Sequence, residues 1–188
     1  MFSLVGLMIL SACGGNDHEE SSDHESTVAV EQEEGTSEHH SHMHHSSDGE
    51  IPEGLQAASN PKFPVGSTAK MSAEHMEGMK GEEATIVGAF DTTAYAVSYT
   101  PTNGGEPVKE HKWVVYEEVQ LEGNEPIKQN SQVILNADHM EGMQGATATI
   151  DSIEKTTVYM VDYTSSTGEK VKNHKWVTES ELVEKEVN

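Results

Sequence analysis

Basic residues are scarce in this sequence, and arginine is absent altogether. Its 188 residues include 11 lysines but 33 aspartates and glutamates, so the formal net charge is −22. Because binding to a phosphate backbone needs clustered Lys and Arg, we do not expect nucleic acid as a partner. The acidic excess favours cations instead.

Cysteine is almost as scarce, since Cys13 is its single example. A chain with one cysteine cannot form an internal disulfide. A soft-metal site built without thiolates has to take its sulfur from methionine, of which the chain has nine. The methionines are therefore candidate ligands.

Recognisable catalytic motifs are missing as well. We find no nucleophile and base at a characteristic spacing, no glycine-rich nucleotide loop and no HExxH zinc motif. The sequence thus predicts a binding protein rather than an enzyme.

The chain also lacks a long apolar run, because MFSLVGLMIL (1–10) is too short to span a bilayer stably. LSAC follows at once, and small residues before a cysteine resemble the lipobox of bacterial lipoproteins. On that resemblance residues 1–13 are an export signal, and Cys13 becomes the acylated N-terminus that anchors the chain in the lipid bilayer. The expected location is then the outer face of the cytoplasmic membrane.

Residues 14–60 have almost no large apolar side chains. They hold twelve acidic residues and seven histidines, and such a segment buries too little surface to offset its ordering entropy. We therefore expect a disordered tether. Within it, EHHSHMHHSSD (38–48) is a His-rich tract, which is typical of copper, zinc or nickel binding but equally suits a solvated linker. Its candidate ligands are His39, His40, His42, His44 and His45.

The rest of the chain contains a duplication. AEHMEGMKG (73–81) returns as ADHMEGMQG (137–145), and VKEHKWV (108–114) returns as VKNHKWV (171–177). The offset falls from 64 to 63 residues at a hairpin-like turn, where a duplicated fold tolerates a change of length. We therefore divide this part into two domains: a first repeat, 61–122, and a second repeat, 129–188.

Both repeats have the pattern of β-structure. Tyr95, Val97 and Tyr99 alternate with small residues, which predicts a strand with one packed face, and residues 159–163 repeat the pattern. Several short strands in about 60 residues favour a small closed barrel, because closure removes exposed sheet edges. The sequence predicts an all-β fold of two tandem barrels, which are SH3-like by analogy.

Each HMEGM motif is predicted to be a tight loop, because its glycines disfavour a helix. Such a loop can turn imidazole and thioether groups toward one point, and these are good ligands for Cu(I), whereas Mg²⁺ and Ca²⁺ require oxygen. On an alternating strand, the histidine of each HKW motif shares one face with the tryptophan two residues later. This histidine can complete the site or can be an ordinary hydrogen-bonded strand residue. The candidate ligands are His75, Met76, Met79 and His111, with His139, Met140, Met143 and His174.

A role in the core competes with metal binding for these methionines, since Met fills irregular gaps well. Met71 aligns with Leu135, so sulfur is not required there, and we predict that Met71 packs in the core. The second methionine of each HMEGM motif resembles a packed loop residue as much as a ligand. The first methionine lies beside the histidine, which favours the ligand role.

The lipobox, the His-rich acidic spacer and the tandem HMEGMxG…HKWV pattern together resemble the YdhK-like family of bacterial lipoproteins, over residues 61 to about 183. The resemblance implies a surface protein of a Gram-positive bacterium that sequesters copper and supports copper tolerance. The eight His and Met residues of the repeats are the positions that bear the shared motif.

The leading prediction is therefore a membrane-anchored, extracytoplasmic copper-binding lipoprotein. In one alternative the spacer histidines scavenge zinc and the barrels are only scaffolds. In another, the repeats bind cell wall or a peptide through an aromatic surface that includes Tyr95, Tyr99 and Trp113.

Overall fold

The computed structural model describes residues 47–120, 123 and 125–185. The predicted all-β class is confirmed, because the regular elements of these residues are strands and two short 3₁₀ turns. The predicted signal segment with Cys13, and the five candidate histidines of the His-rich tract, lie outside the described residues.

The two repeats form the same elements in the same order. The strands are β1 (Gln56–Ala57), β2 (Thr68–Met71), β3 (Glu83–Tyr99), β4 (Val108–Val115), β5 (Val119–Gln120), β6 (Gln132–Leu135), β7 (Thr147–Thr164), β8 (Lys170–Thr178) and β9 (Leu182–Val183), and the 3₁₀ turns are η1 (Tyr116–Glu118) and η2 (Glu179–Glu181). Elements β2 to β5 of the first repeat therefore correspond to β6 to β9 of the second.

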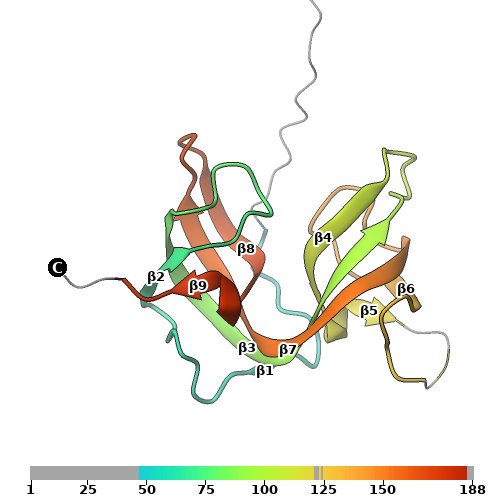
Figure 1. The fold of residues 1–188 in the computed structure, drawn as a ribbon, viewed down its shortest axis with the longest axis horizontal. Coiled ribbons are helices and arrows are strands. Elements are labelled where there is room, and N and C mark those ends of the chain that lie inside the picture. Colours follow the sequence, from blue (N-terminus) through green and yellow to red (C-terminus); the bar gives the residue numbers. More distant parts are fainter. Residues whose placement is uncertain (1–46, 121–122, 124, 186–188) are drawn as a thin grey trace, which may run out of the picture. The chain divides into compact units, whose positions relative to one another are not determined.

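The long strands β3 and β7 form the centre of the sheet. They pair antiparallel from Ala84 opposite Tyr163 to Tyr99 opposite Ala148, and each of them continues past the middle of the other (Figure 1). Strands β1, β2 and β4 pair with β3, and strands β6 and β8 pair with β7. At 17 and 18 residues, β3 and β7 are longer than most strands of globular proteins.

This pairing makes each hydrophobic core from halves of both repeats. One core contains Met71 and Ile86 of the first repeat together with Tyr159 and Val177 of the second. The prediction that Met71 packs in the core is confirmed, since it is 1 % exposed. We call the part of the structure around this core the first lobe.

In the second lobe, each repeat contributes the half that it does not contribute to the first lobe. Its core contains Tyr95 and Val97 of the first repeat with Leu135 and Ile150 of the second. The prediction that residues 61–122 and residues 129–188 form separate barrels is therefore wrong, because β3 and β7 each leave the lobe in which they begin. The closed SH3-like geometry is not confirmed.

A third buried cluster joins the middles of β3 and β7. It includes Phe90, Met160 and the two tryptophans, Trp113 and Trp176. Tyr95, Tyr99 and Trp113 are only 3, 4 and 5 % exposed. The hypothesis that these side chains form an aromatic surface for binding to cell wall is therefore wrong, because they belong to the interior.

Regular structure and a buried side chain are also present before the predicted boundary at residue 60. Strand β1 pairs with β3, and Leu55 is buried in the cluster that holds the tryptophans. The amide of Ser47 donates a hydrogen bond to the carbonyl of Lys172 at 3.0 Å. Composition missed this segment because Ile51 and Leu55 are its two large apolar side chains, and of these Leu55 alone is buried.

Candidate metal centre

The two HMEGM motifs form loops between β2 and β3 and between β6 and β7, as predicted. Gly78 in the first loop has a φ of 70°, in the left-handed region that favours glycine. A Cβ there would lie 2.9 Å from the hydroxyl of Ser166, whose amide donates to the Gly78 carbonyl. Thr102 makes the equivalent bond to Gly142. Each loop is thus bound to the hairpin of the other repeat.

Each HKW histidine follows a β-bulge. Glu110 and Asn173 have φ values of 48° and 50°, and at both places β4 or β8 has one residue more than the strand opposite. A bulge turns the following side chain. His111 consequently lies against the Tyr99 ring of the second lobe, whereas Trp113 belongs to the central cluster. The prediction that these two residues share one strand face is wrong.

The histidines form two pairs, and each pair draws on both repeats. The rings of His75 and His174 have centroids 6.1 Å apart, and those of His139 and His111 are 6.0 Å apart. Metal–nitrogen bonds of about 2.0–2.1 Å place the centre of an imidazole roughly 3 Å from its ion, so this spacing suits two rings that share one ion. We call the first pair site 1 and the second pair site 2.

The two methionines of each HMEGM motif have different surroundings, since the second is a core residue and the first is only partly buried. Met79 and Met143 are 0 % exposed and belong to the two cores. Met76 is only partly buried, and its sulfur lies 3.5 Å from the hydroxyl of Tyr163, whose ring packs against His174 of site 1. Met140 has the same relation to Tyr99 at site 2, with a sulfur–oxygen distance of 3.7 Å. The structure therefore places the first methionine of each motif next to a tyrosine whose ring packs against one histidine of the pair.

One buried carboxylate and one partly buried carboxylate contact the sites, and neither was identified from the sequence. One oxygen of Glu181 lies 3.0 Å from Nε2 of His75, and one oxygen of Glu118 lies 2.7 Å from Nε2 of His139. Glu118 is 3 % exposed. The only signal in the sequence is that the two glutamates occupy equivalent positions in η1 and η2.

These carboxylates determine which nitrogen of a neutral histidine ring carries the proton. Burial alone raises the pKa of Glu181, but the hydrogen bond and charge of His75, with the Thr178 amide and the Trp113 indole, outweigh it and lower that pKa to about 2. An ionised carboxylate only accepts hydrogen bonds, so Nε2 of His75 must carry the proton it donates. In the neutral ring, Nδ1 then keeps its lone pair. The same reasoning applies to His139, because the pKa of Glu118 is also lowered.

The remaining nitrogens of these two rings satisfy the main requirement of a ligand. Nδ1 of His75 and Nδ1 of His139 are buried and have no hydrogen-bond partner within the described part of the chain. A carboxylate on one imidazole nitrogen is the usual support for a metal on the other. No group of three or more His, Cys, Asp or Glu converges among the described residues. An ion held at either site would therefore use two imidazoles and a thioether.

The depressed pKa of Glu181 predicts a loss of stability in acid. A carboxylate whose folded pKa lies below its unfolded value of 4.5 stabilises the fold above that value, and this contribution disappears as the pH falls toward 2. The shift corresponds to about 3 kcal/mol at most. We expect urea unfolding of Glu181→Gln to show a smaller free energy at pH 7 and a shallower decline between pH 4.5 and 2 than the unmodified protein. Parallel pH profiles would contradict this assignment.

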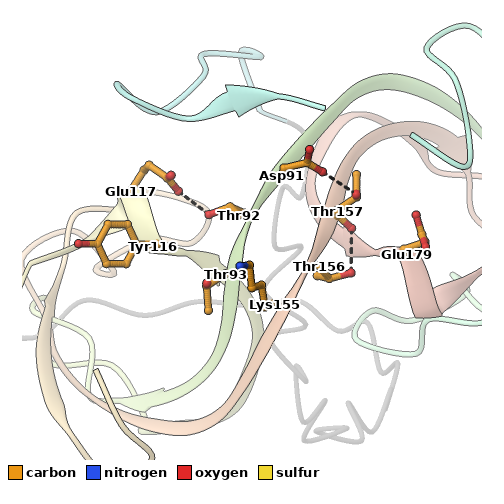
Figure 2. A pocket seen from close by; sticks show the side chains of 9 residues that line it. All are labelled: Asp91, Thr92, Thr93, Tyr116, Glu117, Lys155, Thr156, Thr157 and Glu179. Atoms are coloured by element: carbon orange, nitrogen blue, oxygen red, sulfur yellow. Dashed lines mark hydrogen bonds between the residues drawn. The ribbon is translucent and has the colours of Figure 1, made fainter. Parts of the chain in front are cut away.

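An open groove of about 720 Å³ lies elsewhere, over the middle of β3 and β7 (Figure 2). The Thr92 hydroxyl donates to Glu117 and the Thr157 hydroxyl donates to Asp91, so these carboxylates already have partners. None of the candidate ligands is in its lining, which consists of Asp91, Thr92, Thr93, Tyr116, Glu117, Lys155, Thr156, Thr157 and Glu179. The groove is therefore separate from the histidine sites.

Comparisons with known proteins agree with the duplication. Residues 65–116 and 129–179 each match the family described as "Protein of unknown function (DUF1541)". The chain is 56% identical to "Uncharacterized protein YdhK" of Bacillus subtilis (strain 168) over 183 residues, which cover 97% of this chain and 85% of that protein. A crystal structure of a DUF1541 family protein (ydhK) from Bacillus subtilis is similar with a TM-score of 0.71 and 63% identity, covering 76% of this chain and 97% of that one. A solution NMR structure of the ydhK C-terminal domain has a TM-score of 0.61 and 64% identity, covering 65% and 94%.

Proposed function

The chain belongs to the DUF1541 family, and we propose that it binds copper at sites 1 and 2. The observation that carries the proposal is the pair of buried, unpartnered Nδ1 atoms on His75 and His139. Each belongs to a ring whose other nitrogen is held by a carboxylate and whose neighbours are a second imidazole and a partly buried thioether. Imidazole with thioether is a soft ligand set, which favours Cu(I) over Mg²⁺, Ca²⁺ or Mn²⁺.

We further propose that the protein acts outside the cytoplasmic membrane, anchored through acylated Cys13. The apolar run before LSAC and the lack of any other cysteine support this location. Within the described residues, no helix has the length and apolarity needed to cross a bilayer. Capture of copper at the surface would keep the ion from reaching the membrane, which is the basis of copper tolerance.

Competition with a Cu(I) chelator under anaerobic conditions tests the metal sites. The full chain, with the five tract histidines changed to serine in every sample, is expected to bind two Cu(I) ions. His75→Ala and His139→Ala should each remove one ion, and the double variant should bind neither. Ligands matter more than the groups that support them, so each affinity should fall by more than roughly tenfold.

The methionines supply a matched control. Met76→Leu is expected to weaken Cu(I) binding at site 1, because it removes the partly buried thioether that contacts Tyr163 at this site. Met79→Leu keeps an apolar side chain in the core and should leave the affinity unchanged. Full copper binding by the double histidine variant, or equal effects of the two leucine substitutions, would refute this assignment of ligands.

A further inference from the structure

The two tryptophans of the central cluster hydrogen-bond to the glutamates of the sites, and they do so across the repeats. Nε1 of Trp113, in the first repeat, donates to Oε2 of Glu181 in the second at 2.8 Å. Nε1 of Trp176 donates to Oε2 of Glu118 at 3.0 Å. Both tryptophans are buried, at 5 and 0 % exposure.

The indole bond contributes to the orientation of each carboxylate. Oε2 of Glu181 also accepts the backbone amide of Thr178 at 3.0 Å and the hydroxyl of Thr178 at 3.2 Å, so the indole is one of three donors that hold this oxygen in place. Oε1 is left for His75. Glu118 repeats the arrangement with the amide of Val115. The plane of each carboxylate, and with it the direction of the histidine ring, therefore depends on an indole of the other repeat.

The strands that carry the tryptophans add a second connection. Trp113 lies on β4, which also carries His111 of site 2, yet its indole supports site 1. Trp176 lies on β8 with His174 of site 1 and supports site 2. Each of the two strands thus supplies a histidine to one site and an indole that donates a hydrogen bond to the carboxylate of the other site.

We propose that Trp113 and Trp176 are positioning residues for the metal sites. Each tryptophan orients the histidine of one site through a glutamate, while the strand that carries the tryptophan supplies a histidine to the other site. This inference rests on the proposed copper sites, but its first consequence concerns the metal-free protein. Loss of the indole N–H at position 113 changes the environment of the Nε2 proton of His75 and leaves the environment of the Nε2 proton of His139 unchanged. Loss at position 176 does the reverse.

The test uses Trp113→Phe and Trp176→Phe in the full chain, since phenylalanine keeps an aromatic ring and removes only the donor and part of the bulk. Imidazole ¹⁵N chemical shifts of the metal-free protein report which ring nitrogen carries the proton. We expect Trp113→Phe to change the shifts of His75 selectively and Trp176→Phe those of His139. Shifts that move equally at both histidines, or at neither, overturn the proposal, because general loosening of the core would act on both.

Copper binding then gives the second readout. Trp113→Phe should lower the Cu(I) affinity of site 1 by about tenfold, as loss of a group that orients a ligand does, and should change site 2 by less than twofold. His139→Ala and His75→Ala provide backgrounds in which only one site binds. Selective ¹⁵N shifts without any copper binding would support the positioning role and refute the proposed function, so the two failures are distinguishable.

Discussion

Residues 47–120 and 125–185, produced as two separate polypeptides, are each expected to be unfolded as monomers. Each fragment would contain half of the first core and half of the second, and neither half has the other to pack against. Burial of a large apolar side chain contributes roughly 1.5–3 kcal/mol. Several such side chains are lost from each core. The sum of their contributions exceeds the whole stability of a typical domain, about 5–15 kcal/mol.

Equimolar mixing of the two fragments should restore the fold as a complex. The measurements are sedimentation velocity for the mass and near-ultraviolet circular dichroism for the buried tryptophans. Full-length protein cleaved between residues 120 and 125 after folding is the control, and it should retain the signal of the intact chain. Cooperative unfolding of either fragment at the mass of a monomer would contradict the interleaved arrangement of β3 and β7.

Much of the site could be predicted from the sequence because the duplication marks it. His75, Met76 and their counterparts stand in identical motifs, and glycines at fixed places predicted the loops that hold them. The choice of partners could not be predicted in the same way. Because the repeats are alike, a barrel closed within one repeat and a sheet in which β3 also pairs with β7 satisfy the same local preferences. The actual pairing depends on one uninterrupted strand in each repeat, which short windows of alternation do not reveal.

The carboxylates and the bulges were missed for different reasons. Glu118 and Glu181 are two of 33 acidic residues, and nothing in their neighbours distinguishes a buried glutamate from a solvated one. The positive φ of Glu110 is unusual for a residue with a long side chain. Alternation therefore predicted that His111 and Trp113 share a face, whereas the bulged strand places one at the metal site and the other in the central cluster.

Replacement of Glu118 by alanine is expected to lower the free energy of unfolding by about 3–5 kcal/mol, the usual result of removing one partner of a buried pair. It would leave the Trp176 indole, the Val115 amide and the Nε2 proton of His139 without their acceptor. Glu117→Ala is the matched control, because the neighbouring Glu117 accepts a bond from the hydroxyl of Thr92 in the open groove. Its effect should stay below about 1 kcal/mol. Urea unfolding measures both, and equal losses would contradict the special role of Glu118.

Glu118→Gln separates the shape of this side chain from the direction of its hydrogen bonds. Two N–H donors, from Trp176 and Val115, point at one oxygen of Glu118, so the glutamine must place its carbonyl oxygen there. Its NH₂ group then faces His139 and can only donate, which forces Nε2 of the neutral ring to accept and moves the ring proton to Nδ1. We expect a folded protein whose site 2 loses at least tenfold in Cu(I) affinity while site 1 is unchanged. Imidazole ¹⁵N shifts and the chelator competition measure the two effects together. Copper binding that stays intact at site 2 although the ring proton has moved to Nδ1 would show that Nδ1 of His139 is not the ligand.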